Sequence, residues 1–237
     1  LTISHLIVVV NLFWGYYSIA IYLFFRLFIG KVFFDKTGLM PIPIMELSLE
    51  ERIVQMPKVV FYYLKTFFFP KTLLIDQQWI VTKITISDFY FPLFIDSIFF
   101  ACLFLIGLYI YKKKGDLLKV YIFFLIWFLS GLLFHLQIVP LDMTVADRWF
   151  YFPLIGLLGV IGVALLASNF IKNNKYIFFF IGLAVICSLS VRTIIRNTNW
   201  QNAIALYSHD LKEGGDNYDI HNNLGDELMK SNQLDLA

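Results

Sequence analysis

The stretch YFPLFIDSIFFACLFLIGLYIY, residues 90–111, decides the fold class of this chain. It is almost entirely apolar and is followed at once by Lys112, Lys113 and Lys114. An α-helix needs about 20 mostly apolar residues to cross the hydrocarbon layer of a bilayer. Tyr90–Tyr111 is therefore predicted to be a transmembrane helix with a cationic end.

The composition of the whole chain agrees with lipid as the solvent. Of the 237 residues, 59% are hydrophobic and 19% aromatic, including 26 Phe, whereas only 15% are charged. A soluble domain normally carries about 25% charged residues, and the mean hydropathy here is +0.73. This composition excludes intrinsic disorder. The net charge of +2 is too small for a protein that binds nucleic acid.

The two cysteines, Cys102 and Cys187, lie far apart in separate apolar runs. Two dispersed cysteines build neither a disulfide scaffold nor a metal site. We expect both to be core or lipid-facing thiols.

Four further stretches have the length and composition of membrane spans, which gives five in all. Trp or Tyr stands at several of their ends, where aromatic rings suit the headgroup level. The first stretch is too long for the apolar part of a signal peptide and lacks a small-residue cleavage site. The chain is thus predicted to be an all-α, polytopic membrane protein. Its predicted spans are Ile3–Gly30, Tyr90–Tyr111, Leu117–Val139, Trp149–Ser168 and Tyr176–Ile194.

A sixth apolar stretch, Ile53–Phe69, has the pattern of an amphipathic helix. Such a helix lies along the membrane interface with its Lys side chains reaching the headgroups, and a further span is the alternative. The apolar face comprises Ile53, Met56, Val60, Phe61, Leu64, Phe67 and Phe68, and the polar face comprises Arg52, Gln55, Lys58, Tyr62 and Lys65.

The lysines of the short loops predict which way the helices run, because cations in such loops mark the cytoplasmic side. Two connections are lysine-rich, whereas the loop Pro140–Arg148 holds a single cation. We expect this loop, the segment from about Lys31 to Phe89 and the tail after Arg196 to lie on the periplasmic or lumenal side. The inner lysines are Lys112, Lys113, Lys114 and Lys119 in one connection and Lys172 and Lys175 in the other.

After Ile195 the composition changes to Asn, Asp, Glu, Lys and His, which is typical of a soluble portion. Part of this tail fits the helix pair of a tetratricopeptide repeat, in which small residues stand where helices approach closely. Asn199–Lys212 would be the second helix of a degenerate first repeat, and an ordinary amphipathic helical hairpin is the alternative. The residues that fit the repeat are Ala203, Tyr207, Leu224, Gly225, Leu228 and Ala237.

We expect the chain to be a fragment of a longer protein. It begins with Leu1 in an apolar run and stops at Ala237 within the repeat pattern. Stacked repeats of this kind need several copies to be stable.

The run VADRWFYFPLIG, residues 145–156, preceded by Ile138-Val139-Pro140, resembles a signature of the transmembrane and tetratricopeptide repeat-containing protein O-mannosyltransferases and their bacterial relatives. The resemblance covers roughly residues 55–237, with Asp147 where Glu is usual and Leu154 where a small residue is common. Two flanking elements agree with it. The element before it comprises Tyr63-Leu64-Lys65 through Phe69-Pro70 and Leu73–Asp76. The element after it comprises Arg192, Arg196, Trp200 and Leu206-Tyr207.

The resemblance implies a transmembrane domain of the GT-C glycosyltransferase type over residues 1–196 and a repeat region over residues 197–237 on the extracytoplasmic side. Such an enzyme transfers a sugar from a polyprenyl-phosphate carrier, dolichyl phosphate mannose in the eukaryotic members, to a Ser/Thr or another hydroxyl acceptor. The implied partners are membrane lipid, the lipid-linked sugar and a protein bound through the repeats, with no tightly bound cofactor. The catalytic acidic residue of the family lies in the first outer loop, upstream of Leu1.

A transfer of this kind needs cations to hold the departing lipid phosphate and a carboxylate to take a proton from the acceptor. Arg148 is the first candidate for the phosphate, because a guanidinium can bind two phosphate oxygens at once. Snorkelling to headgroups or pairing with Asp147 is the alternative. Lys65, Lys71 and His135 are further candidates, which headgroup attraction or packing explains equally well.

Asp147 and Asp142 are expected to support this site. Thr144, followed by Asp147 and an apolar run, resembles a capping box in which the acid satisfies a free N–H at a helix start. Asp147 would otherwise support Arg148, and Asp142 is a loop carboxylate without an assigned partner. His135 and Gln137 are predicted to lie about one turn inside a span. The sequence shows no Cys/His metal spacing, glycine-rich phosphate loop or Ser-His-Asp arrangement.

Two other classes of protein are compatible with the composition. A membrane-anchored scaffold would use the repeats to recruit partners and would lack an acidic residue in its first outer loop. A transporter or lipid-carrier flippase would show internal symmetry and broken helices at mid-membrane, and the sequence shows no such symmetry.

Overall fold

The computed structural model describes Tyr16, Tyr17, Ile21 and Phe24, and then residues 42–168 and 174–233. Helices make up the regular structure of these residues, and no strand is found among them. Four of the described helices are long and apolar enough to cross a membrane, which indicates a membrane-embedded protein. The predicted span Ile3–Gly30 lies almost wholly outside the described residues.

The described part opens with α2 (Pro43–Glu46) and the longer helix α3 (Leu49–Phe68). A capping box starts α3: the Glu51 N–H donates to the Ser48 hydroxyl (3.4 Å), and the Ser48 N–H donates to the Glu51 carboxylate (2.8 Å). The helix ends just before Pro70, since the residue preceding a proline disfavours the helical conformation. α3 is amphipathic and is not among the four candidate spans, which fits an interfacial helix.

The inward face of α3 differs from the prediction. Gln55 and Tyr62 were expected on the polar face, yet Gln55 is 1% exposed and Tyr62 is half-buried. Burial of Gln55 is tolerated because its amide donates to the Val81 carbonyl (3.1 Å) and accepts from the Val81 N–H. Ile53 and Phe68, expected on the apolar face, are exposed instead. Residue type alone did not reveal that the irregular segment after α3 folds back over its polar side.

The four candidate spans among the described residues coincide with four of the five predicted spans, with shifted ends. A π-helical turn, η2 (Ile86–Tyr90), leads into α4 (Phe91–Lys113), which is followed by α5 (Gly115–Leu133). A short 3₁₀ turn, η3 (Asp147–Phe150), leads into α6 (Tyr151–Ala167), and α8 (Lys175–Asn199) is the last span. Cys102 on α4 and Cys187 on α8 are free and exposed, as expected of lipid-facing thiols.

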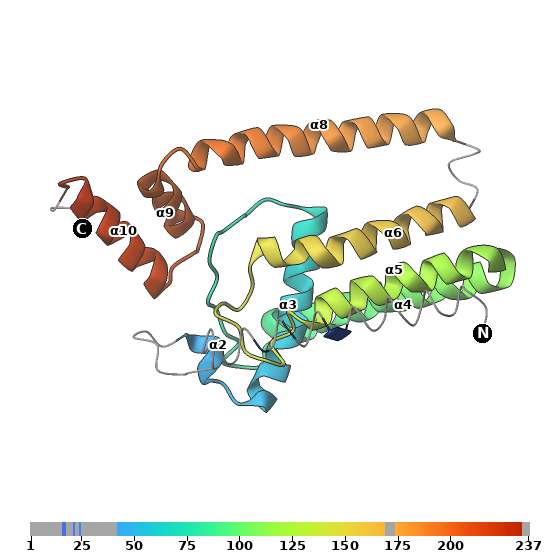
Figure 1. Cartoon of the computed structure of the whole chain (residues 1–237), viewed down its shortest axis with the longest axis horizontal. Coiled ribbons are helices and arrows are strands. Elements are labelled where there is room, and N and C mark those ends of the chain that lie inside the picture. Colours follow the sequence, from blue (N-terminus) through green and yellow to red (C-terminus); the bar gives the residue numbers. More distant parts are fainter. Residues whose placement is uncertain (1–15, 18–20, 22–23, 25–41, 169–173, 234–237) are drawn as a thin grey trace. The chain divides into compact units, whose positions relative to one another are not determined.

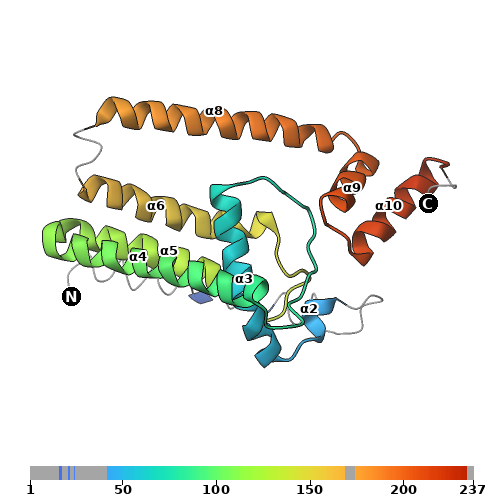
Figure 2. The ribbon, with the colours of Figure 1, turned by 180° about the vertical axis from the view of Figure 1, so that it is seen from behind.

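Helices α5 and α6 lie side by side, as Figures 1 and 2 both show. Glycines of α6 permit this close packing. A Cβ atom at Gly156 would lie 2.4 Å from the backbone nitrogen of Phe128, and one at Gly159 would lie 2.2 Å from the Phe124 ring. Small residues at membrane helix contacts let the backbones approach in this way. The largest buried side chains of the surrounding core are Tyr63, Ile110, Tyr121, Phe128 and Leu157.

The polar tail forms two helices, α9 (Ala203–Lys212) and α10 (Tyr218–Lys230), which pack on each other. Asn202 and Asn217 cap them, each accepting a hydrogen bond from a backbone N–H of the first turn. The pair fits both the tetratricopeptide repeat and the helical hairpin. Within the described residues, a Cβ atom at Gly225 would meet nothing within 4 Å, so the close approach that the repeat pattern predicts there is not seen. Ala237 lies outside the described residues.

Candidate functional site

Two irregular segments, residues 70–85 and 134–146, meet beside α3. The Thr144 N–H donates to the Gln77 carbonyl (2.9 Å), and Gln77 and Val145 form an antiparallel bridge. The Thr144 hydroxyl donates to the Trp79 carbonyl (2.6 Å). These bonds hold the two segments together at the start of α6, where Asp147 and Arg148 follow.

Gln137 organises the second segment. Helix α5 ends at Leu133, and Gln137 adopts a positive φ of 61°. Its amide donates to the carbonyls of Met143 and Thr144 (both 2.8 Å) and accepts from the Leu141 N–H (3.0 Å). The prediction that His135 and Gln137 lie inside a span is therefore wrong, because the Gln137 side chain satisfies the backbone of a loop.

The predicted capping box at Thr144 and Asp147 is also wrong. The Thr144 hydroxyl donates to the Trp79 carbonyl instead, and η3 has no side-chain cap. Asp147 instead accepts a hydrogen bond from the Tyr62 hydroxyl of α3. The expected pairing of Asp147 with Arg148 is not seen among the ion pairs of the described residues.

A cavity of about 910 Å³ lies next to these groups. Its walls are largely apolar and come from α3, α6 and α8, with Phe67, Leu154 and Leu189 among them. Four charged residues also line the cavity: Asp147, Arg148, Arg192 and Arg196. A long apolar wall joined to a cationic wall suits an amphipathic ligand with an anionic group.

The three arginines differ in how their charges are balanced. Arg148 is exposed and makes only long contacts, to the Ile75 carbonyl (3.4 Å) and the Met143 sulfur (3.6 Å). Arg192 donates to the carbonyls of Pro70 (2.8 Å) and Lys71 (2.6 Å). Neither forms an ion pair among the described residues, although the charge of Arg148 acts on Asp76 from a longer distance.

Arg196 is neutralised within the protein. It lies 3.1 Å from Asp210 of α9, whose side chain is 0% exposed. The other Asp210 oxygen accepts from the Ile75 N–H (2.8 Å), and His209 lies 3.0 Å from the first. A buried ion pair of this kind is tolerated only when further hydrogen bonds satisfy its members. This pair therefore fixes the tail against residues 70–79 at the edge of the cavity.

Of the predicted phosphate ligands, only Arg148 lines the cavity. Lys65 and Lys71 are exposed and lie outside its lining. His135 stacks on Trp149 at 5.4 Å between ring centroids, and burial lowers its pKa, which favours the neutral form over a phosphate-binding cation. Asp142 is exposed and does not line the cavity, whereas Asp147 does.

Several side chains of the site were not predicted as site residues. Arg192 and Arg196 lie four residues apart at the end of an apolar helix, a spacing that places both on one face. That pattern was visible in the sequence. The partnership of Tyr62 with Asp147 was not, because 85 positions separate the two residues.

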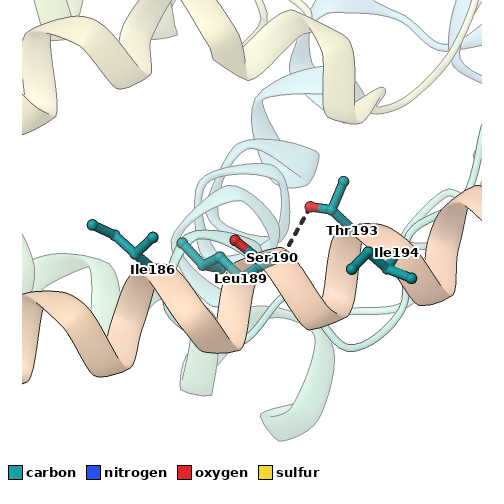
Figure 3. A pocket seen from close by; sticks show the side chains of 5 residues that line it. All are labelled: Ile186, Leu189, Ser190, Thr193 and Ile194. Carbon is teal, nitrogen blue, oxygen red and sulfur yellow. Dashed lines mark hydrogen bonds between the residues drawn. The ribbon is translucent and has the colours of Figure 1, made fainter.

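A second hollow, shown in Figure 3, lies on one side of α8. It is shallow and is lined by Ile186, Leu189, Ser190, Thr193 and Ile194. The Thr193 hydroxyl is satisfied by the Leu189 carbonyl of its own helix (2.9 Å). This hollow presents no charged group to a ligand.

The described residues contain no group of three or more His, Cys, Asp or Glu placed to hold a metal ion. Comparison with family models, curated proteins and solved structures finds no match to the chain.

Proposed function

We propose that this chain belongs to a membrane glycosyltransferase that uses a polyprenyl-phosphate sugar as its donor. The observation that carries the proposal is the cavity in which apolar walls of α6 and α8 meet Arg148 and Arg192, two cations without carboxylate partners among the described residues. The resemblance of residues 145–156 to the signature of the O-mannosyltransferase family supports the same function.

The chemistry explains why the cations matter. An acceptor hydroxyl attacks the anomeric carbon, its proton passes to a base, and the bond between that carbon and the phosphate oxygen breaks. The polyprenyl phosphate leaves with the electron pair, so its negative charge grows as the bond breaks. Arg148 stabilises this developing charge through charge-assisted hydrogen bonds. In the family that the chain resembles, the base belongs to the first outer loop.

The tail has a place in this scheme. Asp210 and Arg196 fix α9 at the edge of the cavity, on the side where Arg148 lies. A protein acceptor bound by tetratricopeptide repeats that begin with α9 and α10 would be presented to the same opening. This opening and the repeats would then lie on the periplasmic or lumenal side.

Replacement of Arg148 tests the proposal. We expect Arg148→Ala in the full-length protein to reduce sugar transfer from a polyprenyl-phosphate donor by about 10- to 100-fold, the worth of a hydrogen bond to a charged group. Lys83→Ala is the matched control, since Lys83 is an exposed cation of segment 70–85 outside the cavity lining. Wild-type transfer by Arg148→Ala would contradict the phosphate role, as would a complete absence of donor binding by the wild-type protein.

A further inference from the structure

Four side chains form a hydrogen-bonded chain that ends at the cavity. The Trp79 indole N–H donates to the Gln77 amide oxygen (3.1 Å), and the Gln77 amide nitrogen donates to the Tyr62 hydroxyl. The Tyr62 hydroxyl in turn donates to Asp147. Gln77 is 7% exposed, so this chain is shielded from water at its centre.

The chemistry of the first member fixes the direction of the whole chain. A Trp indole nitrogen can only donate, so Gln77 must turn its oxygen to Trp79 and its NH₂ group to Tyr62. The Tyr62 hydroxyl must then accept a hydrogen bond from the Gln77 amide and donate its single proton to the Asp147 carboxylate. Burial and the nearby charge of Asp147 raise the pKa of Tyr62, so the hydroxyl keeps its proton at physiological pH.

Asp147 is the immediate neighbour of Arg148, and both line the cavity. Of the three arginines that line the cavity, Arg196 pairs with Asp210 and Arg192 donates to two backbone carbonyls, so Arg148 is the one without a close partner in the described part of the chain. The Asp147 carboxylate is engaged by the Tyr62 hydroxyl and by the backbone N–H of Leu74, whereas Arg148 makes only the two long contacts to Ile75 and Met143. Arg148 therefore lines the cavity without an ion pair among the described residues.

We propose that Tyr62 is a positioning residue that holds Asp147 away from Arg148 and so keeps Arg148 free for the phosphate group of the lipid ligand. This inference rests on the proposed function, because it assigns Tyr62 a role through Arg148. Without the Tyr62 hydroxyl, Asp147 keeps its backbone hydrogen bond from Leu74 but loses its side-chain donor in a partly buried setting, where a poorly satisfied carboxylate is costly. The charge of Arg196 acts on Asp147, but Arg196 is already paired with Asp210. Arg148 is then the cation left to pair with Asp147, and that ion pair competes with the phosphate.

Equilibrium binding of radiolabelled farnesyl phosphate to the protein in lipid nanodiscs tests this role without requiring sugar transfer. We expect Tyr62→Phe to weaken binding by about tenfold, since the ligand must break the new ion pair. We expect Tyr62→Phe/Asp147→Asn to bind within about twofold of the wild type, because an amide cannot neutralise Arg148. A purely structural role of Tyr62 would give no such rescue.

Tyr121→Phe is the control for the loss of a tyrosine hydroxyl, since Tyr121 donates to the Leu103 carbonyl (2.6 Å) and does not line the cavity. Its binding should equal that of the wild type, and thermal unfolding of every variant checks that the fold is kept. Undiminished binding by Tyr62→Phe, or a double variant as weak as Tyr62→Phe, overturns the role of Tyr62. If Arg148→Ala also binds farnesyl phosphate as the wild type does, the proposed function fails with it. If Arg148→Ala loses binding, only the inference about Tyr62 fails.

Discussion

At the scale of single residues, Asp76 shows how a buried carboxyl group responds to its surroundings. Its side chain is 6% exposed, and one of its oxygens has no hydrogen-bond partner among the described residues. The amide of Gln78 donates to its other oxygen (3.1 Å) and to Asp219 of α10. Burial and the charges of Asp219 and Asp142 raise the pKa of Asp76 to about 6, although Gln78 and Arg148 act in the opposite direction.

The raised pKa predicts how stability changes with pH. An unfolded Asp titrates near pH 3.9. Between about pH 4 and the folded pKa of about 6, the folded state therefore holds a proton that the unfolded state has released. Stability must fall as pH rises through this window. We expect Asp76→Asn, which mimics the protonated group, to raise the melting temperature at pH 7.5 and to have little effect at pH 4.5. Equal shifts at both pH values would show that Asp76 does not titrate in this window.

At the scale of elements, the contact between α5 and α6 depends on the absence of a side chain at Gly156. A Cβ atom there would lie 2.4 Å from the backbone nitrogen of Phe128, and backbone cannot rotate out of the way as a side chain can. We expect Gly156→Ala to destabilise the fold by about 1–3 kcal/mol, the usual cost of overpacking. Thermal unfolding in detergent measures the effect.

Gly162→Ala is the matched control, because a Cβ atom at Gly162 of the same helix would meet nothing within 4 Å. We expect this variant to be as stable as the wild type or slightly more stable, since Ala favours a helix over Gly. If both substitutions had the same effect, the close approach of α5 and α6 would not be the reason for Gly156.

The elements also show what a sequence can and cannot predict. Long apolar runs predicted four spans in the right places, because lipid requires a helix wherever such a run crosses it. The predicted end of this span, Val139, lies several residues beyond Leu133, where α5 ends. The sequence does not reveal that the amide of Gln137 satisfies carbonyls of the following loop. The predicted capping box at Thr144 was wrong for the same reason. The Thr144 hydroxyl donates to the carbonyl of Trp79, which is far away in the sequence. Arg148 was recognised as a lone cation, whereas the hydrogen bond that engages its neighbour Asp147 comes from Tyr62, far away in the chain.

At the scale of the whole molecule, tertiary contacts require the tail and the charged end of the cavity to lie on the same side of the membrane. The Ile75 N–H donates to Asp210 of α9, and Gln78 donates to Asp219 of α10. The tail and segment 70–79 must therefore lie on the same side of the membrane. Because Ile75 and Arg148 both line the cavity, its charged end lies on that side as well. A single label on the tail thus reports the side of the cavity opening.

We predict that this side is the periplasm or lumen, because the short turn between α4 and α5 carries the lysines that favour the cytoplasm. Exposed Asn222 of α10 and exposed Lys113 at the end of α4 are suitable label sites. Cys102 and Cys187 are first replaced by Ala, since both are exposed. Asn222→Cys should then react with a membrane-impermeant thiol reagent from outside, and Lys113→Cys only after lysis. The reverse pattern would place Arg148 and the tail in the cytoplasm, where an extracytoplasmic acceptor cannot reach them.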